Sequence, residues 1–298
     1  MTPIPLTPVG GFLGAGKTTL VNHLLATADR RFGVLVNDFG AIAIDAALIA
    51  AHDGGVVSLT NGCVCCETGG DLGAGLAQLA TRDPPIDHAI VEASGVGDPW
   101  RIAQLALVEP GFSLDPIVVV ADALNLERQL AGRWVADTVR GQLLAAEIVV
   151  LNKIDLAPDP AGARAALASL CPMAPVVETR NAAVAIGRLS FPVSPRPRFR
   201  ANPASAHAFP VWHYLPARPF DRARLRAVLA ALPRSILRVK GFCRLDGDPA
   251  ASLLQFAAGQ WALSLYGEAP PGLVVIGTPE MPAPPDLVAR FDFALLEQ

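Results

Sequence analysis

The sequence predicts an α/β protein in which helices cover both faces of a mostly parallel sheet, followed by a smaller α+β domain. Short apolar runs alternate with helical stretches through the first two-thirds of the chain, and most of these runs are continuous rather than alternating. Continuous apolar runs are typical of strands that are buried on both faces of a parallel sheet. A segment rich in proline and arginine then interrupts the pattern, which predicts a boundary between two domains.

The predicted elements repeat the order strand, loop, helix. In the first domain, residues 1–190, we expect strands at 33–36, 86–91, 117–120 and 148–151, and helices at 17–28, 71–80, 102–107, 138–145 and 161–170. Residues 191–206 are the predicted linker. In the second domain, residues 207–298, we expect a helix from the N-cap Asp221 to residue 232, strands at 235–245, 263–266 and 273–277, and a last helix at 286–296.

The composition is that of a folded intracellular chain. Of the 298 residues, 52% are hydrophobic and 17% are charged, which excludes wholesale disorder and allows a sizeable core. The longest charge-free run, residues 249–267, is interrupted by proline, glutamine and glycine, so it makes a poor membrane span. Because the first residues lack a signal-peptide pattern and three of the five cysteines cluster, we expect a reducing, cytoplasmic setting without a membrane segment.

Residues 11–18, GFLGAGKT, match the phosphate-binding pattern GxxxxGK[ST]. They precede a predicted helix, so backbone N–H groups and the helix N-terminus can surround phosphate oxygens. Lys17 would reach the terminal phosphates and the Thr18 hydroxyl would bind Mg²⁺. The candidate nucleotide-binding residues here are Gly11, Gly14, Ala15, Gly16, Lys17, Thr18 and Thr19. Pro8 lacks an N–H donor, which predicts that the first strand carries it at an end or an edge.

A second motif, NKID at residues 152–155, follows the predicted strand 148–151. The Asp155 carboxylate can accept two N–H bonds from the edge of guanine, a pair of donors that adenine does not present. The motif therefore predicts GTP rather than ATP as the nucleotide, with Asn152 and Lys153 as further nucleotide-binding residues.

Glu92 ends another predicted strand and opens the segment EASGVGDP, residues 92–99. A carboxylate at this place, downstream of a phosphate-binding loop, can hold Mg²⁺ or its bound water. The alternative is that Glu92 only caps the strand at the surface. Gly95 could donate its N–H to the γ-phosphate and act as a switch. Lys17 and Glu92 are the candidate catalytic residues.

Three cysteines lie within NGCVCC, residues 61–66. Thiolates at Cys63, Cys65 and Cys66 favour a soft or borderline metal such as Zn²⁺ or Cu(I), and three ligands leave one tetrahedral position open. A redox-active dithiol and buried structural cysteines are the alternatives for this cluster.

Positive charge is concentrated in residues 195–244, which contain 11 Lys and Arg and a single acid, within a chain of net charge −3. Such a band could bind an acidic protein, or it could be a solvated surface. Nucleic acid is an unlikely partner because no cluster of aromatic residues accompanies the band.

These motifs, in this order, resemble the CobW-like P-loop GTPases, which are related to the nickel-accessory GTPases of hydrogenase and urease. The resemblance rests on GGFLGAGKTTL, NGCVCC, EASGVGDP, NKIDL and, in the second domain, SILRVKG. It implies a metal-linked GTPase that delivers Zn²⁺, Co²⁺ or a similar ion such as Ni²⁺ to a client metalloprotein. By position, Cys63, Cys65 and Cys66 would hold the cargo metal, and residues 37–40 would be a switch, with Asp45 as a further acid.

The chain departs from the family pattern at three positions. Asp38 stands where a Glu is usual, Ala41 where a Glu is often found, and Ser58 where a Glu or Gln is common. These changes remove carboxylates that could complete the metal site. The histidine-rich linker of many relatives is also replaced by the proline- and arginine-rich segment.

We therefore expect a zinc metallochaperone that binds GTP and hydrolyses it. Hydrolysis should be slow, because no arginine finger or water-orienting glutamine can be assigned in the sequence. The client would dock through the basic C-terminal domain, and the chain would be a monomer or a homodimer. Two alternatives remain open: a cobalt-handling GTPase for cobalamin or nitrile-hydratase-type maturation, and a non-catalytic, GTP-dependent binding module that responds to metal or redox state.

Overall fold

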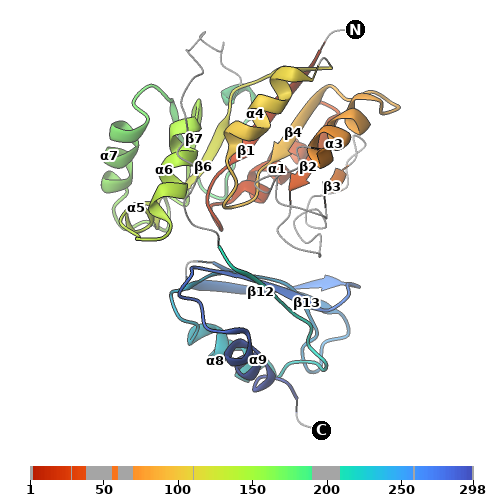
Figure 1. The fold of residues 1–298 in the computed structure, drawn as a ribbon, viewed down its shortest axis with the longest axis vertical. Helices are drawn as coiled ribbons and strands as arrows, with labels where there is room; N and C mark the ends of the chain where they lie inside the picture. The colour runs from red at the N-terminus through yellow and green to blue at the C-terminus, as the bar shows by residue number, and fades with distance from the viewer. Residues whose placement is uncertain are drawn as a thin grey trace. The chain divides into compact units, whose positions relative to one another are not determined.

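The computed structural model describes residues 3–27, 29–37, 56–59, 70–109, 111–189, 209–257 and 259–296. The chain forms two compact units, residues 1–206 and 207–298 (Figure 1). Each unit has its own sheet and its own buried core.

The first unit contains a parallel sheet. Its strands are β1 (Ile4–Gly10), β2 (Phe32–Asn37), β3 (Val56–Leu59), β4 (His88–Glu92), β5 (Phe112–Leu114), β6 (Val118–Asp122), β7 (Ile148–Asn152) and β8 (Val176–Glu178). Their order across the sheet is β3-β2-β4-β1-β6-β7-β8, and β5 also pairs with β1. Each recorded pairing is parallel. The predicted α/β class is confirmed.

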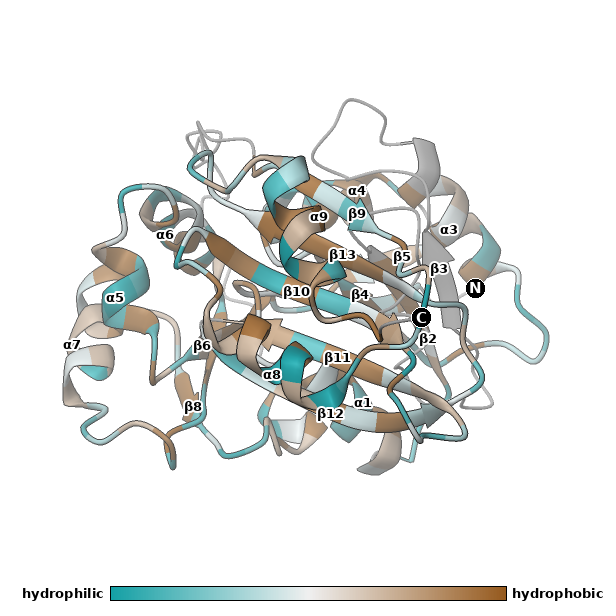
Figure 2. Ribbon diagram, turned by 90° about the horizontal axis from the view of Figure 1, so that it is seen from below, coloured by the Kyte–Doolittle hydropathy of each residue, from teal (hydrophilic) through white to brown (hydrophobic). Residues whose placement is uncertain are grey.

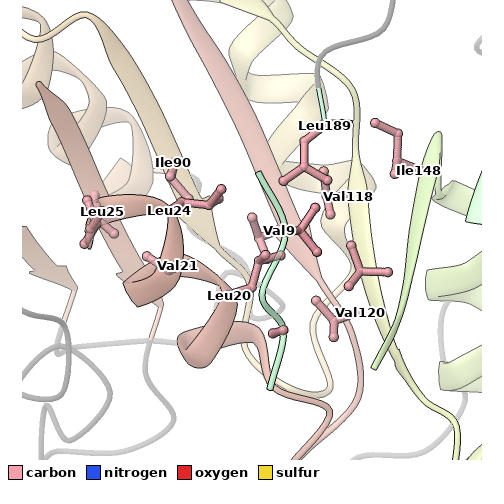
Figure 3. Close-up of a cluster of buried hydrophobic side chains, with 14 of the residues drawn as sticks. Val9, Leu20, Val21, Leu24, Leu25, Ile90, Val118, Val120, Ile148 and Leu189 are labelled. Carbon is pink, nitrogen blue, oxygen red and sulfur yellow. The ribbon is translucent and has the colours of Figure 1, made fainter. Parts of the chain in front are cut away.

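Helices pack on both faces of this sheet. They are α1 (Lys17–Thr27), α3 (Gly70–Ala80), α4 (Pro99–Val108), α5 (Leu126–Leu130), α6 (Ala136–Ala145), α7 (Ala161–Leu170) and a 3₁₀ turn at Ile186–Arg188. Successive residues of a strand point to opposite faces. In β2, Val34 and Val36 accordingly join the cluster with α1, whereas Leu35 joins the cluster with α3 and α4. Figure 3 shows the α1 side chains Leu20 and Leu24 in one cluster with Val9 of β1 and Ile90 of β4.

Pro8 does not lie at an end or an edge, so that prediction is wrong. It pairs in register with Val91 in the interior of β1, a central strand. The Leu6 carbonyl accepts a hydrogen bond from the Asp115 N–H, on the side of β1 that faces β5. Residues two apart in a strand present their backbone groups to the same side, so the nitrogen of Pro8 faces this side too. On that side the pairing with β5 ends at Leu6 and the pairing with β6 begins at Val9, and the missing donor falls in this gap.

The second unit is an antiparallel sheet with two helices. Its strands are β9 (Val211–Tyr214), β10 (Ile236–Cys243), β11 (Ala251–Ala257), β12 (Gln260–Gly267) and β13 (Gly272–Gly277), in the order β12-β11-β10-β13-β9. The helices α8 (Arg222–Ala230) and α9 (Pro284–Asp292) lie on the same face of the sheet (Figures 1 and 2). Asp221 caps α8 as predicted, because its side chain accepts the Arg224 N–H.

The charge-free run 249–267 contains both strands of the hairpin that β11 and β12 form. Seven residue pairs from Ala251–Gly267 to Ala257–Gln260 join the two strands. Gly259, with φ +83°, supplies the left-handed residue of the turn. In the described part of the chain, no helix is long and apolar enough to cross a membrane.

Candidate nucleotide-binding site

The phosphate-binding loop connects β1 to α1 and depends on glycines at two close approaches. Gly11 has φ +135°, and a Cβ there would lie 2.3 Å from the Val120 carbonyl oxygen. Gly16 has φ +111°, and a Cβ there would lie 2.4 Å from Nδ2 of Asn152. Neither contact leaves room for a side chain, and neither backbone conformation suits one. The neighbouring strands β6 and β7 thus fix the path of the loop.

The polar side chains predicted for the phosphate end lie together. Lys17 begins α1, is 6% exposed, and its Nζ donates to the Phe12 carbonyl oxygen at 3.4 Å, within the loop. The Thr18 hydroxyl donates to Oε1 of Glu92 at 3.0 Å. Glu92 ends β4 and is 3% exposed, so it is not a surface cap of the strand. A hydroxyl and a carboxylate side by side are the hard oxygen ligands that Mg²⁺ prefers.

The NKID segment is tied to the phosphate-binding loop by its asparagine. Asn152 is 2% exposed; its Nδ2 donates to the Ala15 carbonyl at 2.9 Å, and its Oδ1 accepts from the Ala182 N–H at 2.8 Å. One side chain therefore joins β7, the phosphate-binding loop and the loop that follows β8. Asp155 lies two residues beyond Lys153 and is exposed.

Lys153 is held by a buried acid. It has φ +61°, and its Nζ lies 2.8 Å from Oδ2 of Asp122, which is 2% exposed at the end of β6. Asp122 also accepts from the Leu124 N–H and from Nδ2 of Asn125. These bonds fix the left-handed turn that leads from β7 towards Asp155.

The segment after Glu92 packs on the phosphate-binding loop. A Cβ at Gly95 would lie 2.2 Å from Cδ2 of Leu13, so only glycine allows this approach. Gln142 of α6 donates from Nε2 to the carbonyl oxygens of Gly97, at 2.8 Å, and Gly95, at 3.4 Å. The described candidate residues of all three motifs therefore lie at the carboxyl edge of the sheet, where α/β folds bind ligands.

The two domains match family models. The nucleotide-binding domain of CobW/HypB/UreG matches residues 5–178, and the C-terminal domain of the cobalamin synthesis protein CobW matches residues 209–293. The chain belongs to the CobW/HypB/UreG family. The resemblance stated from the motifs is confirmed.

Individual relatives match most of the chain. The zinc chaperone YjiA of Escherichia coli K12 is 28% identical over 278 residues, 86% of each chain. The zinc-regulated GTPase metalloprotein activator 1 of Dictyostelium discoideum is 26% identical over 323 residues, which is 89% of this chain and 68% of that one. A crystal structure of a Zn(II)-bound triple mutant of the YjiA GTPase covers 99% of this chain and 100% of its own, with 25% identity and a TM-score of 0.50.

The cysteines predicted to hold the cargo metal lie outside the described residues, whereas Thr18, the predicted Mg²⁺ ligand, is described above. These cysteines are Cys63, Cys65 and Cys66. Asp38 and Ala41, two of the positions that depart from the family pattern, and the further acid Asp45 also lie outside the described residues, and the third departing position, Ser58, falls in β3. Within the described ranges, no group of three His, Cys, Asp or Glu side chains could hold a metal ion.

The remaining cysteines, Cys171 and Cys243, are both buried. Burial raises the pKa of the Cys171 thiol, and burial together with the nearby Asp248 raises the pKa of Cys243 to about 12. Both therefore stay protonated thiols and poor metal ligands.

Sequence reasoning missed Asp122, Gln142 and the loop that contains Ala182. Asp122 could have been predicted, because it directly follows the apolar run 117–121, as Glu92 and Asn152 follow theirs at the same edge of the sheet. Gln142 had none, since its partners lie more than 40 positions earlier in the chain.

Proposed function

We propose that this chain is a cytoplasmic, GTP-binding and slowly GTP-hydrolysing metallochaperone that carries zinc at Cys63, Cys65 and Cys66 to a client metalloprotein. The observation that supports it best is the joining of the phosphate end to the NKID segment through Asn152. A nucleotide that spans the two motifs would contact loops that one side chain already connects.

At the phosphate end, the loop amides and Lys17 would bind the β- and γ-phosphates of GTP. Thr18 and Glu92 would hold Mg²⁺, Glu92 through a bound water, and the ion would neutralise the charge that develops on the phosphate oxygens. Hydrolysis adds water to the γ-phosphorus and releases GDP and phosphate. The Gly95 N–H would donate to the γ-phosphate, and the close approach of Gly95 to Leu13 would help to keep its backbone in place.

At the other end, the exposed Asp155 would accept the two N–H donors on the edge of guanine. The turn that carries Asp155 is held by Lys153 and Asp122, so the carboxylate is attached to a rigid part of the fold. This supports guanine as the base, and adenine would lose both bonds.

Zinc is supported by the printed names of the relatives and by the chemistry of the ligands. Three thiolates suit Zn²⁺ far better than Mg²⁺, and they leave a position open for a client ligand. Because the cysteines lie in sequence between β2 and β4, both of which lead into the nucleotide site, we propose that GTP and GDP change metal affinity by linkage.

The client would be an acidic partner of the arginines in the C-terminal domain. On α8, Arg222 forms an ion pair with Asp248, at 2.7 Å, whereas Arg224 lies over the Phe293 ring and Arg226 over the Trp261 ring. An arginine that lies over an aromatic ring, as Arg226 does, can still donate from the edge of its guanidinium group to a carboxylate. Salt should therefore weaken the association strongly.

The decisive experiment measures Zn²⁺ affinity by competition with a chelating dye under reducing conditions, with GTPγS, with GDP and without nucleotide. We expect tight binding that differs between GTPγS and GDP and is lost when Cys63, Cys65 and Cys66 are all changed to Ser. Cys171→Ser is the matched control and should bind as the parent does. Equal affinity in the three nucleotide states would contradict the coupling.

The same assay separates the alternatives. Selective binding of Co²⁺ over Zn²⁺ would favour cobalt handling. Tight GTP binding without turnover, even with metal and client present, would favour a non-catalytic binding module.

A further inference from the structure

We propose that Gln142 is a positioning residue for GTP hydrolysis, which holds the segment of residues 94–97 against the phosphate-binding loop. This inference rests on the proposed GTPase function. Gln142 lies on α6 and belongs to none of the nucleotide-binding motifs.

The geometry of Gln142 is that of a clamp. Its side chain is 3% exposed, and Nε2 donates to the Gly97 carbonyl at 2.8 Å and to the Gly95 carbonyl at 3.4 Å. Carbonyl oxygens only accept hydrogen bonds, so the NH₂ group and not the amide oxygen must face them. A buried amide group in this place satisfies two backbone acceptors that water cannot reach.

The clamped segment begins close to the proposed chemistry and ends at the start of α4. It begins two residues after Glu92, which accepts the Thr18 hydroxyl, and it ends one residue before Asp98, which caps α4 through the Trp100 N–H. Within it, the Gly97 N–H donates to the Ser94 carbonyl at 2.9 Å. A Cβ at Gly97 would lie 2.8 Å from the Ser94 hydroxyl, so glycine keeps the turn this tight.

Gln142 holds the carbonyl groups at both sides of Val96, next to the residue whose N–H would meet the γ-phosphate. Gly95 touches Leu13 through its backbone, and its N–H can meet a γ-phosphate only while its peptide plane keeps its orientation. Holding the Gly95 carbonyl limits rotation of the following peptide, and holding the Gly97 carbonyl limits drift of the whole turn. The precise placement of a donor can affect rate far more than it affects binding.

The clamp also connects the two ends of the nucleotide site. α6 ends at Ala145, and β7 begins at Ile148 and ends at Asn152. Only residues 146 and 147 separate the helix that holds the 94–97 segment from β7, and β7 ends at the first residue of NKID. A movement of the segment on loss of the γ-phosphate would pull on this helix.

The test uses the full chain with Gln142→Met, which keeps the length and bulk of the side chain and removes its donors. Gln142→Glu is the second variant, because a carboxylate would repel the two carbonyls. The matched control is Gln129→Met, a buried glutamine on α5 that no hydrogen bond of the described residues joins to the 94–97 segment. The readouts are kcat, KM, GDP affinity, thermal unfolding and hydrogen exchange of the peptide that spans residues 92–99.

We expect kcat of Gln142→Met to fall about tenfold, with Gln142→Glu lower still, while GDP affinity stays close to that of the control. Both variants should also unfold at a somewhat lower temperature than the parent, because two buried carbonyls lose their donor. Exchange in the 92–99 peptide should rise in both variants and not in Gln129→Met. Unchanged exchange in this peptide would overturn the inference, as would a uniform rise across the chain. Exchange is measured without nucleotide, so it tests the clamp even if the parent fails to hydrolyse GTP, a result that would count against the proposed function alone.

Discussion

Both edges of the first sheet contain buried polar side chains, but the two sets are built differently. At the carboxyl edge, Asn152 and Gln142 each bond backbone groups of other segments. At the amino edge, His88 is 1% exposed and bonds the Thr7 hydroxyl through Nε2 at 2.8 Å, with Oδ2 of Asp115 at 3.7 Å.

The difference shows that burial of a polar group does not by itself mark a functional site. Thr7 and His88 lie within strands, and burial, with a smaller contribution from Arg30, lowers the pKa of His88 to about 4, so the ring stays neutral. At the carboxyl edge the bonded groups belong to loops with left-handed backbone at Gly11, Gly16 and Lys153. A ligand that enters between loops can move them, whereas it cannot move a strand.

The largest expected effect is at the carboxyl edge. Lys17→Ala removes the cation that would face the β- and γ-phosphates, so kcat/KM for GTP should fall by at least about a hundredfold. Steady-state phosphate release measures it. Thr27→Ala, at the other end of α1, is the control and should behave as the parent does. Equal turnover of Lys17→Ala and the parent would sink the assignment of the phosphate-binding loop.

Substitution of His88 at the amino edge should change the pH dependence of stability and not the turnover of GTP. Because the folded pKa of His88, about 4, lies below its usual 6.5, unfolded chains bind the proton first as the pH falls. The stability that this provides is complete above pH 6.5 and is lost towards pH 4, by about 3 kcal/mol in total. Nucleotide binding at neutral pH should be unaffected by His88→Gln.

The measurement is the free energy of unfolding by denaturant from pH 7 to 4.5. Subtracting the curve of His88→Gln isolates the histidine from Asp115, whose pKa is raised by burial and which therefore changes stability in the opposite direction. The exposed His213→Gln is the control. A His88→Gln curve parallel to that of the parent would show that the histidine is not held neutral.

The smallest expected effect is a loss of nucleotide affinity on substitution of Asn152, at the carboxyl edge. Asn152→Ala breaks the bonds to Ala15 and Ala182 and should cost about 1–2 kcal/mol of nucleotide affinity, roughly tenfold in Kd. Asn152→Asp should cost more, because it places a carboxylate against the Ala15 carbonyl. Calorimetric titration with GTPγS measures both. If Asn152→Ala lost stability but no affinity, the link between the loops would be structural only.

The sequence was sufficient for the contiguous motifs and for the strands that are apolar throughout. GFLGAGKT and NKID are recognisable because their residues are adjacent, and β7 was predicted to within one residue. Short strands with exposed residues were missed: Val176 and Glu178 in β8 are exposed, so no apolar run marks them. Of the β11–β12 hairpin, only residues 263–266 of β12 were predicted, because no charged residue in the run marks the turn that separates the two strands.

The bonds that assemble the site could not be predicted. Asn152 was chosen for its motif, yet its partners Ala15 and Ala182 are ordinary residues that only the fold brings together. Pro8 shows the same limit. Proline is usually excluded from central strands, but here it falls where the partner of β1 changes from β5 to β6, so no hydrogen bond is lost.

The pairing of β1 also sets the order in which the chain can fold. β1 pairs with β4, whose residues come some eighty positions later, and then with β6, so the centre of the first sheet must wait for most of its unit to be synthesised. In the second unit, β11 pairs with β12 across a short turn. Local contacts form faster than distant ones. We therefore expect the N-terminal unit to be slow to fold and to depend on protection while its apolar strands remain unpaired.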